Sequence, residues 1–336
     1  MNHLVSWQLR ERFAAALSAM YGTEVPAYTT LVEVTEQVNR DYVAGTPGAE
    51  RLGSLARVTA ERHGAIRVGT PAELAAVADL FAAFGMVPVG YYDLRDADEA
   101  DDFVGQAVAA FALSREPIEQ SWYDELSRVS AVAADIAGVR STHINHLTPR
   151  VLDIDELYRR MTAHGITMID AIQGPPRTDG PPVLLRQTSF RALAEPCRFR
   201  GNDGTVIEGT LRVRFGEVEA RGVALTPKGR ERYDAAMSAT DPATVWDQYF
   251  PPTGDEMAAQ GLAYYRGGDP SKPVVYEDFL PASAAGIFRS NLDGDAEAGD
   301  VADDSGYSID WMAGAIGRVV HDPYALYESL CKEALA

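Results

Sequence analysis

The stretch THINHLTPRVLDID, from Thr142 to Asp155, decides how the rest of the chain is interpreted. It predicts a β-strand over residues 144–152 that runs into a helix capped by Asp155. His143 and His146 are three residues apart, so on an extended strand they face opposite sides. His146 lies well inside the strand, whereas His143 lies at its entry, so we expect His146 to point into the interior. If His146 binds a metal, a second histidine and a carboxylate must come from elsewhere in the chain.

The order of elements around this stretch repeats an order found earlier in the chain. Residues 62–92 are typical of a strand, a helix and a second strand, and residues 144–172 follow the same order. Two further strands complete a β-α-β-β-β arrangement. The predicted strands are 62–68, 86–92, 144–152, 166–172, 183–193 and 211–225. Two such halves could close into one curved mixed sheet around a site.

The first helix of this repeated unit is well marked at both ends. Thr70 to Glu73, with the sequence TPAE, offers an N-cap, a proline at the first helical position and a capping-box glutamate. Apolar residues at three- and four-residue spacing predict one buried face, and Gly85 is placed to end the helix.

The two ends of the chain are predicted to be helical. Residues 3–21 form an amphipathic helix that Gly22 ends, a second helix follows over 28–42, and the chain turns helical again from residue 228. We therefore expect an α+β protein that forms one compact unit. Its three parts are an N-terminal helical cover (1–58), a metal-binding core (59–230) and a C-terminal helical extension with a pocket-covering loop (231–336).

Composition excludes several classes of partner. The net charge of −19 argues against nucleic acid and against an anionic membrane. No apolar run is long enough to cross a membrane, and the N-terminus does not resemble a signal peptide, so we expect a cytoplasmic protein. Cys197 and Cys331 are too few for a disulfide framework. The acidic stretch near residue 300 lacks the ligand spacing of a calcium loop.

Two histidines and a pair of glutamates are the candidate metal ligands. His63 and His146 each lie near the start of the first strand of a repeated unit. The last predicted strand puts Glu217 and Glu219 on one face, which is costly in an interior unless a metal, a substrate or a cation compensates them. Two imidazoles and one carboxylate suit a non-haem Fe(II) site. The alternative is a ladder of arginine and glutamate on a solvated sheet face, and spacing does not decide between the two.

Arg67 is the candidate substrate-binding residue. It lies four residues after His63, so both are expected on the same side of the first strand. A guanidinium beside a metal is suited to binding a carboxylate in bidentate fashion. The alternative is a surface arginine at the end of a strand.

Four segments of the chain resemble the 2-oxoadipate dioxygenase/decarboxylase family, also called hydroxyglutarate synthases. They are RHGAIRVGTPAELAAVADLFAAFGMVPVGYYDL, THINHLTPRVLDID, FGEVEARGVALTPKGR and YEDFLPASAAGIFRSNL. The resemblance implies a fold of the vicinal-oxygen-chelate superfamily, whose paired βαβββ modules supply two histidines and a glutamate to one metal.

The resemblance also implies a role for each candidate residue. His63, His146 and Glu217 would hold Fe(II), with Mn(II) and Co(II) accepted by the same ligands. Arg67 would bind the substrate, and Ser283, preceded by Ala282, would close over it. This chain departs from many relatives at Ala282, where they have valine, and at Ala220, where glutamine is common.

The activity that the resemblance implies is conversion of 2-oxoadipate and O2 to 2-hydroxyglutarate and CO2, a step of lysine catabolism. The partners would be a small 2-oxo dicarboxylate and O2, and no oligomeric state is implied. Two alternatives remain open at this point. One is a redox-neutral metal-dependent lyase or isomerase of the same superfamily, in which Glu219 could be a fourth ligand. The other is a non-catalytic binding or regulatory protein whose charged residues form ion pairs.

Overall fold

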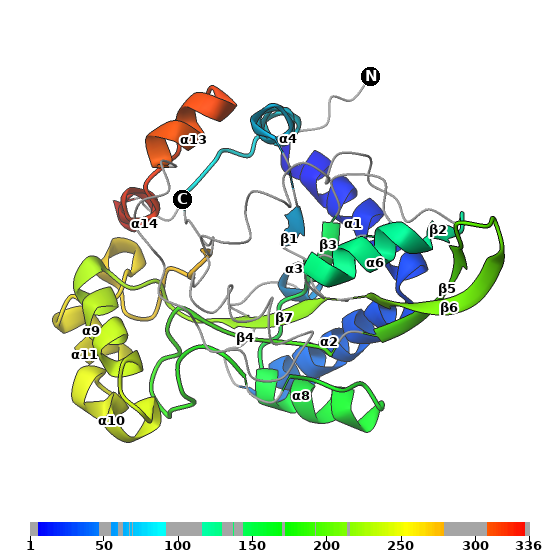
Figure 1. Ribbon diagram of the computed structural model, residues 1–336. Helices are drawn as coiled ribbons and strands as arrows, with labels where there is room; N and C mark the ends of the chain where they lie inside the picture. The colour runs from blue at the N-terminus through cyan, green and yellow to red at the C-terminus, as the bar shows by residue number, and fades with distance from the viewer. Residues whose placement is uncertain are drawn as a thin grey trace.

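The computed structural model of the protein is a mixed α+β fold, in which helices surround small sheets (Figure 1). The structure describes residues 6–46, 55–59, 63–66, 68, 70–91, 116–129, 137, 144–169, 172–191, 193–213, 216–278 and 308–332. Within these ranges, none of the helices is both long and apolar enough to cross a membrane. The predicted α+β class is confirmed, whereas the predicted division at residues 58 and 230 stays a prediction.

Four short strands form the central sheet; one lies within the stretch from Thr142 to Asp155, one precedes it in the chain and two follow it. They are β1 (His63–Ile66), β3 (Ile144–Thr148), β4 (Leu185–Ser189) and β7 (Glu217–Arg221). β1 pairs antiparallel with β3, and β4 pairs antiparallel with β7. A parallel bridge between Arg150 and Glu219 joins the two pairs, since Val151 N donates to Glu219 O at 2.8 Å. The order across the sheet is therefore β1, β3, β7, β4.

The far edge of β4 is covered by isolated bridges, which replace the strand predicted over 166–172. Gln173 pairs with Gln187, and Met168 pairs with Phe190. Gly174 follows with φ 103°, and a Cβ there would lie 2.3 Å from Leu185 O. The chain can turn away so close to β4 only because this residue is glycine.

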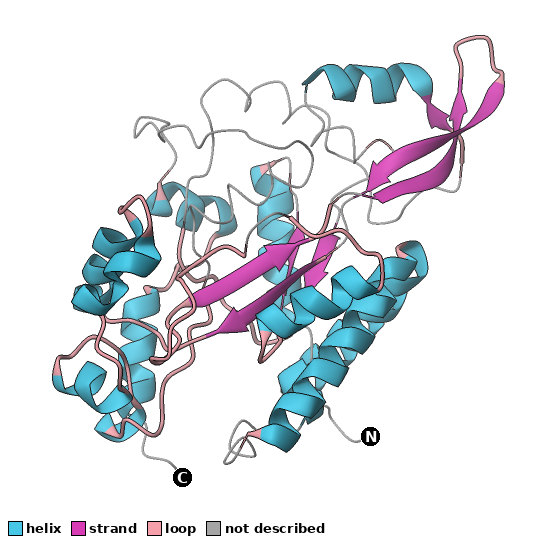
Figure 2. Ribbon diagram, turned by 90° about the horizontal axis from the view of Figure 1, so that it is seen from below, coloured by secondary structure: helices cyan, strands magenta, loops and turns pink. Residues whose placement is uncertain are grey.

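A second sheet extends away from the central one (Figure 2). It contains β2 (Ile118–Glu119), β5 (Leu193–Arg200) and β6 (Val206–Val213), and α6 (Gln120–Val129) follows β2. β5 and β6 form an antiparallel hairpin, closed by a turn in which Gly201 N donates to Thr205 O at 2.9 Å. The sequence does not predict this hairpin, because Pro196 inside β5 weakens the strand pattern.

The N-terminal helices cover the sheet and are fixed to it by one buried amide. They are α1 (Ser6–Glu24), α2 (Pro26–Gly45) and α3 (Leu55–Thr59). The predicted end of the first helix at Gly22 is wrong, because the helix continues to Glu24 and Pro26 starts the next one. The fully buried Asn39 of α2 accepts from Leu152 N at 2.7 Å and donates to Arg150 O at 2.9 Å. This amide attaches the helical cover to the segment that follows β3.

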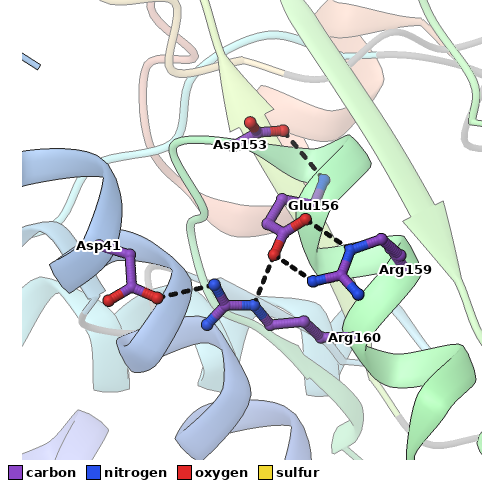
Figure 3. Close-up of polar contacts among 5 residues, drawn as sticks. All are labelled: Asp41, Asp153, Glu156, Arg159 and Arg160. Atoms are coloured by element: carbon purple, nitrogen blue, oxygen red, sulfur yellow. Dashed lines mark hydrogen bonds and ion pairs between the residues drawn. The ribbon is translucent and has the colours of Figure 1, made fainter. Parts of the chain in front are cut away.

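α8 (Ile154–Ala163) lies against α2 and is capped two residues earlier than expected. The predicted cap at Asp155 is wrong: Asp153 is the N-cap, and its carboxylate accepts from Glu156 N at 3.0 Å. Figure 3 shows Glu156 between Arg159 and Arg160, and Arg160 also reaches Asp41 of α2 at 2.7 Å. These ion pairs connect the two helices at the surface.

α4 (Pro71–Ala83) begins and ends where the sequence predicts, but its predicted apolar face is not buried. Thr70 is the N-cap and accepts from Glu73 N at 3.2 Å, and Gly85 has φ 72°. No residue of α4 is buried, however, and Leu80 is 47% exposed. The expected strand over 86–92 is likewise reduced, in the residues described, to one bridge between Val89 and His321. In the part of the chain that the structure describes, α4 packs against α13, and its Phe81 against Phe13 of α1, rather than against a strand.

The C-terminal part is helical, as predicted, and has its own aromatic core. Its helices are α9 (Pro227–Met237), α10 (Pro242–Tyr249), α11 (Gly254–Ala259), η2 (Arg266–Gly268), α13 (Ile309–Ile316) and α14 (Pro323–Lys332). Trp246 stacks on Phe250 at 4.6 Å between ring centroids, and Leu185 of β4 and Val223 belong to the same core. The central sheet therefore contacts this core at the end of β4.

The ion pairs of α8 predict a dependence of stability on pH. Hydrogen bonds from Arg159 and Arg160 lower the pKa of Glu156 from 4.5 to about 2. The stabilisation is therefore fully present above about pH 4.5 and is lost as the pH falls toward 2. We expect the free energy of unfolding of the Glu156→Gln variant, measured by urea denaturation, to fall less steeply with pH over this window than that of the wild type. Equal slopes, at low salt, would contradict the assignment.

Candidate functional site

One face of the central sheet is both buried and polar. Strand alternation separates it from the opposite face, where Val218 packs with Leu157 and Met161 of α8 in the apolar core. The buried polar residues on it, each at most 8% exposed, are Thr148, Gln187, Ser189, Glu217, Glu219 and Arg221. We call this set the polar face. Burial of so many polar groups is costly unless each finds a partner or a ligand.

The polar face is organised by an ion pair between Arg221 and Glu219, whose side chains are 1% and 0% exposed. The guanidinium binds both carboxylate oxygens, with Arg221 Nη2 at 2.9 Å from Glu219 Oε2 and Arg221 Nε bonded to Oε1. Burial alone would lower the pKa of Arg221, but the charge of Glu219 and the hydrogen bond to it outweigh burial and raise it. Arg221 is therefore held in its charged form.

The same guanidinium fixes the start of the predicted pocket-covering loop. Arg221 Nη1 donates to the carbonyl oxygens of Tyr276 at 2.8 Å and Asp278 at 3.1 Å. Tyr327 of α14 adds a contact, accepting from Glu277 N at 3.0 Å. Residues 276–278 are thus held beside the polar face, and the continuation of the predicted loop from residue 279 lies outside the described residues.

Two of the predicted ligand positions lie on adjacent strands. His63 in β1 is paired with Thr148 in β3, and position 146 is two residues from Thr148 on the same strand. Positions 63 and 146 therefore belong to the same face of this strand pair. The side chains of His63 and His146 lie outside the described residues, as do Arg67, Ala282 and Ser283.

Glu217 is the third predicted ligand, and the structure separates it from Glu219. Glu217 is 4% exposed and lies at the start of β7, opposite Ser189. Because Glu219 is held in bidentate fashion by Arg221, Glu217 is the better candidate for a metal. For Glu219 the structure agrees with the alternative of pairing with an arginine. The Arg221–Glu219 pair is buried, however, and not on a solvated sheet face. Among the described side chains alone, no three His, Cys, Asp or Glu residues form a metal site.

Several buried polar atoms on or beside the polar face have no hydrogen-bond partner in the described structure. They are Thr148 Oγ1, both amide atoms of Gln187 and Gln173 Oε1. Native proteins seldom leave such atoms unsatisfied, since each costs about 1–3 kcal/mol. Together with the carboxylate of Glu217, this donor set fits a metal and a polar, oxygen-rich ligand.

A cavity of about 620 Å³ lies on the α8 side of the sheet, where Arg186 and Ala220 line it together with Trp246. At its edge, Asp155 accepts from Arg186 Nη1 at 2.8 Å. Burial alone would raise the pKa of Asp155, but the hydrogen bond and charge of Arg186, with the charge of Arg177, lower it. Arg186 and Gln187 lie on opposite faces of β4, but Arg221 of the polar face also lines this cavity, so the cavity reaches the end of that face.

The comparisons with known proteins decide the family. The family model described as 2-oxoadipate dioxygenase/decarboxylase matches residues 13–99 and 96–291. The chain belongs to this family. A 2-oxoadipate dioxygenase/decarboxylase of Mycobacterium bovis is 64% identical over 408 aligned positions, which cover 99% of this chain and 98% of the relative. The protein of the same description from Pseudomonas putida is 35% identical, with coverage of 95% and 93%.

A solved structure of this family agrees with the fold. It is hydroxyglutarate synthase from Pseudomonas putida in complex with 2-oxoadipate, with a TM-score of 0.76, 30% sequence identity and coverage of 99% of this chain and 97% of that one. A protein from Shigella flexneri matches similarly, with a TM-score of 0.75 and 29% identity.

This 2-oxoadipate dioxygenase/decarboxylase family member is shorter than its relatives. The alignment with the Mycobacterium bovis protein has 408 positions and this chain has 336 residues, so at least 72 positions of the alignment hold no residue of this chain. The two segments matched by the family model meet at residues 96–99, which indicates that positions are missing between α4 and α6.

Sequence reasoning missed the partners of the predicted ligands. The alternation that puts Glu217 and Glu219 on one face also puts Arg221 there, but it predicts no role for Arg221. Gln187 and Thr148 were not singled out at all. The local sequence gives little signal, because Gln187 and Ser189 lie within the continuous polar run from Arg186 to Ser189, which shows no alternation of polar and apolar residues.

The Arg221–Glu219 pair predicts a large loss of stability when one partner is removed. In the Arg221→Met variant the carboxylate of Glu219 stays buried without its cation, so we expect the free energy of unfolding to fall by about 3–5 kcal/mol. The Arg221→Met/Glu219→Leu variant should recover most of this loss, since apolar residues of similar volume replace the whole pair. Urea denaturation measures both.

The matched control is Arg159→Met. Arg159 is 68% exposed and pairs with Glu156 on α8, so its loss should cost less than about 1 kcal/mol. If the double variant were as unstable as Arg221→Met alone, an uncompensated buried charge would not be the cause.

Proposed function

We propose that the protein is a non-haem iron dioxygenase that decarboxylates 2-oxoadipate with O2 to give 2-hydroxyglutarate and CO2. The observation that carries the proposal is the buried polar face, with Glu217 on β7 and positions 63 and 146 on β1 and β3. The relatives named 2-oxoadipate dioxygenase/decarboxylase and the Pseudomonas putida structure with 2-oxoadipate support the substrate. In the cell, the reaction would serve lysine catabolism.

His63, His146 and Glu217 would hold the iron. Two imidazoles and one carboxylate are a donor set that Fe(II) accepts, and they leave coordination positions for a 2-oxo acid and dioxygen. When bound, Fe(II) would supply the chemistry that makes dioxygen reactive toward the 2-oxo acid. The paired βαβββ modules of the vicinal-oxygen-chelate superfamily are part of the proposal, and the order β3, α8, the bridged segment before Gly174, β4 and β7 supports the second module.

The other residues would bind and enclose the substrate. Arg67 would pair with the carboxylate far from the metal, through two charge-assisted hydrogen bonds. Ala282 and Ser283 would cover the substrate from the loop whose start Arg221 fixes at Tyr276. With α8 and the apolar core behind the sheet, this loop would keep water from the reaction.

The reaction balances without a second organic substrate. The bond between the carboxylate carbon and the keto carbon of 2-oxoadipate breaks, and the carboxylate leaves as CO2. The keto carbon becomes a carboxylate with one atom of O2. The other atom is inserted into a C–H bond of the neighbouring carbon, so that this bond is replaced by C–O–H and the hydrogen is kept in the new hydroxyl group. The chain's residues need only bind one 2-oxo dicarboxylate, orient its carbon chain and exclude water.

The Arg221–Glu219 pair counts against the redox-neutral alternative. A lyase or isomerase of this superfamily would need Glu219 as a further metal ligand, but both oxygens of Glu219 bind Arg221. The metal-free alternative, a binding or regulatory protein, is consistent with the Arg221–Glu219 ion pair but does not account for the unsatisfied buried atoms beside Glu217.

Oxygen consumption tests the proposal. The protein is loaded with Fe(II) without oxygen, mixed with 2-oxoadipate and exposed to O2, while oxygen uptake and CO2 release are followed. We expect one CO2 for each O2 consumed and 2-hydroxyglutarate as the product. A Glu217→Gln variant should lose this activity, and a Glu156→Gln variant, changed on the surface of α8, should keep it. If neither 2-oxoadipate nor any other 2-oxo acid causes oxygen uptake, the proposed function is wrong.

A further inference from the structure

Gln187 in β4 is a fully buried amide without a partner. The residue is 1% exposed, and neither Gln187 Oε1 nor Gln187 Nε2 forms a hydrogen bond in the described structure. Asn39, the other buried amide on which the fold depends, uses both ends of its side chain, toward Leu152 N, Arg150 O and Thr59 Oγ1. The structural amide of Asn39 therefore has hydrogen-bond partners within the protein. The amide of Gln187 has none among the described residues, and this difference needs another explanation.

The position of Gln187 points to a ligand on the polar face. Gln187 lies opposite Glu219 in the register of β4 and β7, and Ser189, two residues along β4, lies opposite Glu217. On its other side, Gln187 exchanges backbone hydrogen bonds with Gln173, at 2.8 and 3.0 Å. Glu219, which Arg221 binds through both carboxylate oxygens, is not the partner of Gln187, since Gln187 Nε2 forms no hydrogen bond in the described structure.

The surrounding atoms indicate the chemistry of this ligand. Gln173 Oε1 and Thr148 Oγ1 are also buried without a partner, so unsatisfied atoms gather on the face that carries Glu217. An amide offers two N–H donors and one acceptor, which suit a carboxylate with a neighbouring carbonyl or hydroxyl group. An apolar ligand would leave all of these atoms unsatisfied.

We infer that Gln187 is a substrate-binding residue, whose side-chain N–H groups donate to the 2-oxo acid head group of the substrate. The inference rests on the proposed function and adds a residue to it. It assigns Gln187 to the end of the substrate near Glu217, and leaves Arg67 for the far carboxylate. The carbonyl of the Gln187 amide would accept from the hydroxyl group that the product gains.

Substrate affinity and apo stability together test the inference. Gln187→Leu keeps about the same volume and removes every hydrogen bond. The matched control is Thr188→Val, the next residue of β4, which points to the opposite face and whose buried hydroxyl likewise has no partner. The Kd of 2-oxoadipate is measured by calorimetry on Fe(II)-loaded protein without oxygen, and Tm is measured without substrate.

We expect Gln187→Leu to weaken binding by about ten- to a hundredfold, since a hydrogen bond to a charged group is lost. Its Tm should stay the same or rise, because no protein partner is lost. Thr188→Val should leave Kd unchanged. A purely structural glutamine would give the reverse pattern for Gln187→Leu, with a lower Tm and an unchanged Kd, and that result would overturn the inference.

Substrate binding and turnover by the wild type show whether this inference or the proposed function has failed. If the wild type binds and turns over 2-oxoadipate while Gln187→Leu binds it equally well, only the role of Gln187 is wrong. If the wild type binds another 2-oxo acid instead, the same comparison is made with that acid. If the wild type binds no 2-oxo acid, the proposed function and the inference both fail.

Discussion

The ion pair between Arg221 and Glu219 is the interaction on which the rest of the site depends. It occupies the centre of a buried strand, where an isolated charge would be very costly. By binding Glu219 through both oxygens, Arg221 neutralises one of the two glutamates on the polar face. Its remaining nitrogen binds the backbone carbonyls of Tyr276 and Asp278, where the predicted pocket-covering loop begins. One guanidinium therefore sets the charge of the face and the position of the segment that approaches it.

The central sheet divides the protein into an apolar side and a polar side. Val218 and α8 form part of the apolar core, whereas Glu217 and Glu219, on either side of Val218 in the chain, lie on the polar face. The bridge between Arg150 and Glu219 joins the strand pair that carries positions 63 and 146 to the strand that carries Glu217. The candidate ligands come from distant parts of the sequence, and this short bridge is what brings their strands into one sheet.

Much of this arrangement follows from the sequence. The caps at Thr70 and Gly85, the helical ends and the shared face of Glu217 and Glu219 are local patterns, and the structure confirms them. In the described residues the strand predicted over 86–92 is reduced to a bridge with His321, and the strand predicted over 166–172 is reduced to isolated bridges along β4. A local pattern does not reveal how long a neighbour pairs with a strand. For the same reason, spacing alone could not separate Glu217 from Glu219, since their difference comes from Arg221. The partners of Asn39 and the bare amide of Gln187 also depend on residues distant in sequence.

The central claim is that His63, His146 and Glu217 bind one metal ion. Titration of the metal-free protein with Fe(II) in the absence of oxygen, with bound iron counted per chain, tests it most directly. We predict one Fe(II) for each wild-type chain, strongly reduced affinity in His146→Ala and in Glu217→Gln, and unchanged affinity in Glu156→Gln. Wild-type affinity for Fe(II) in the Glu217→Gln variant, or no binding by the wild type, would contradict the account.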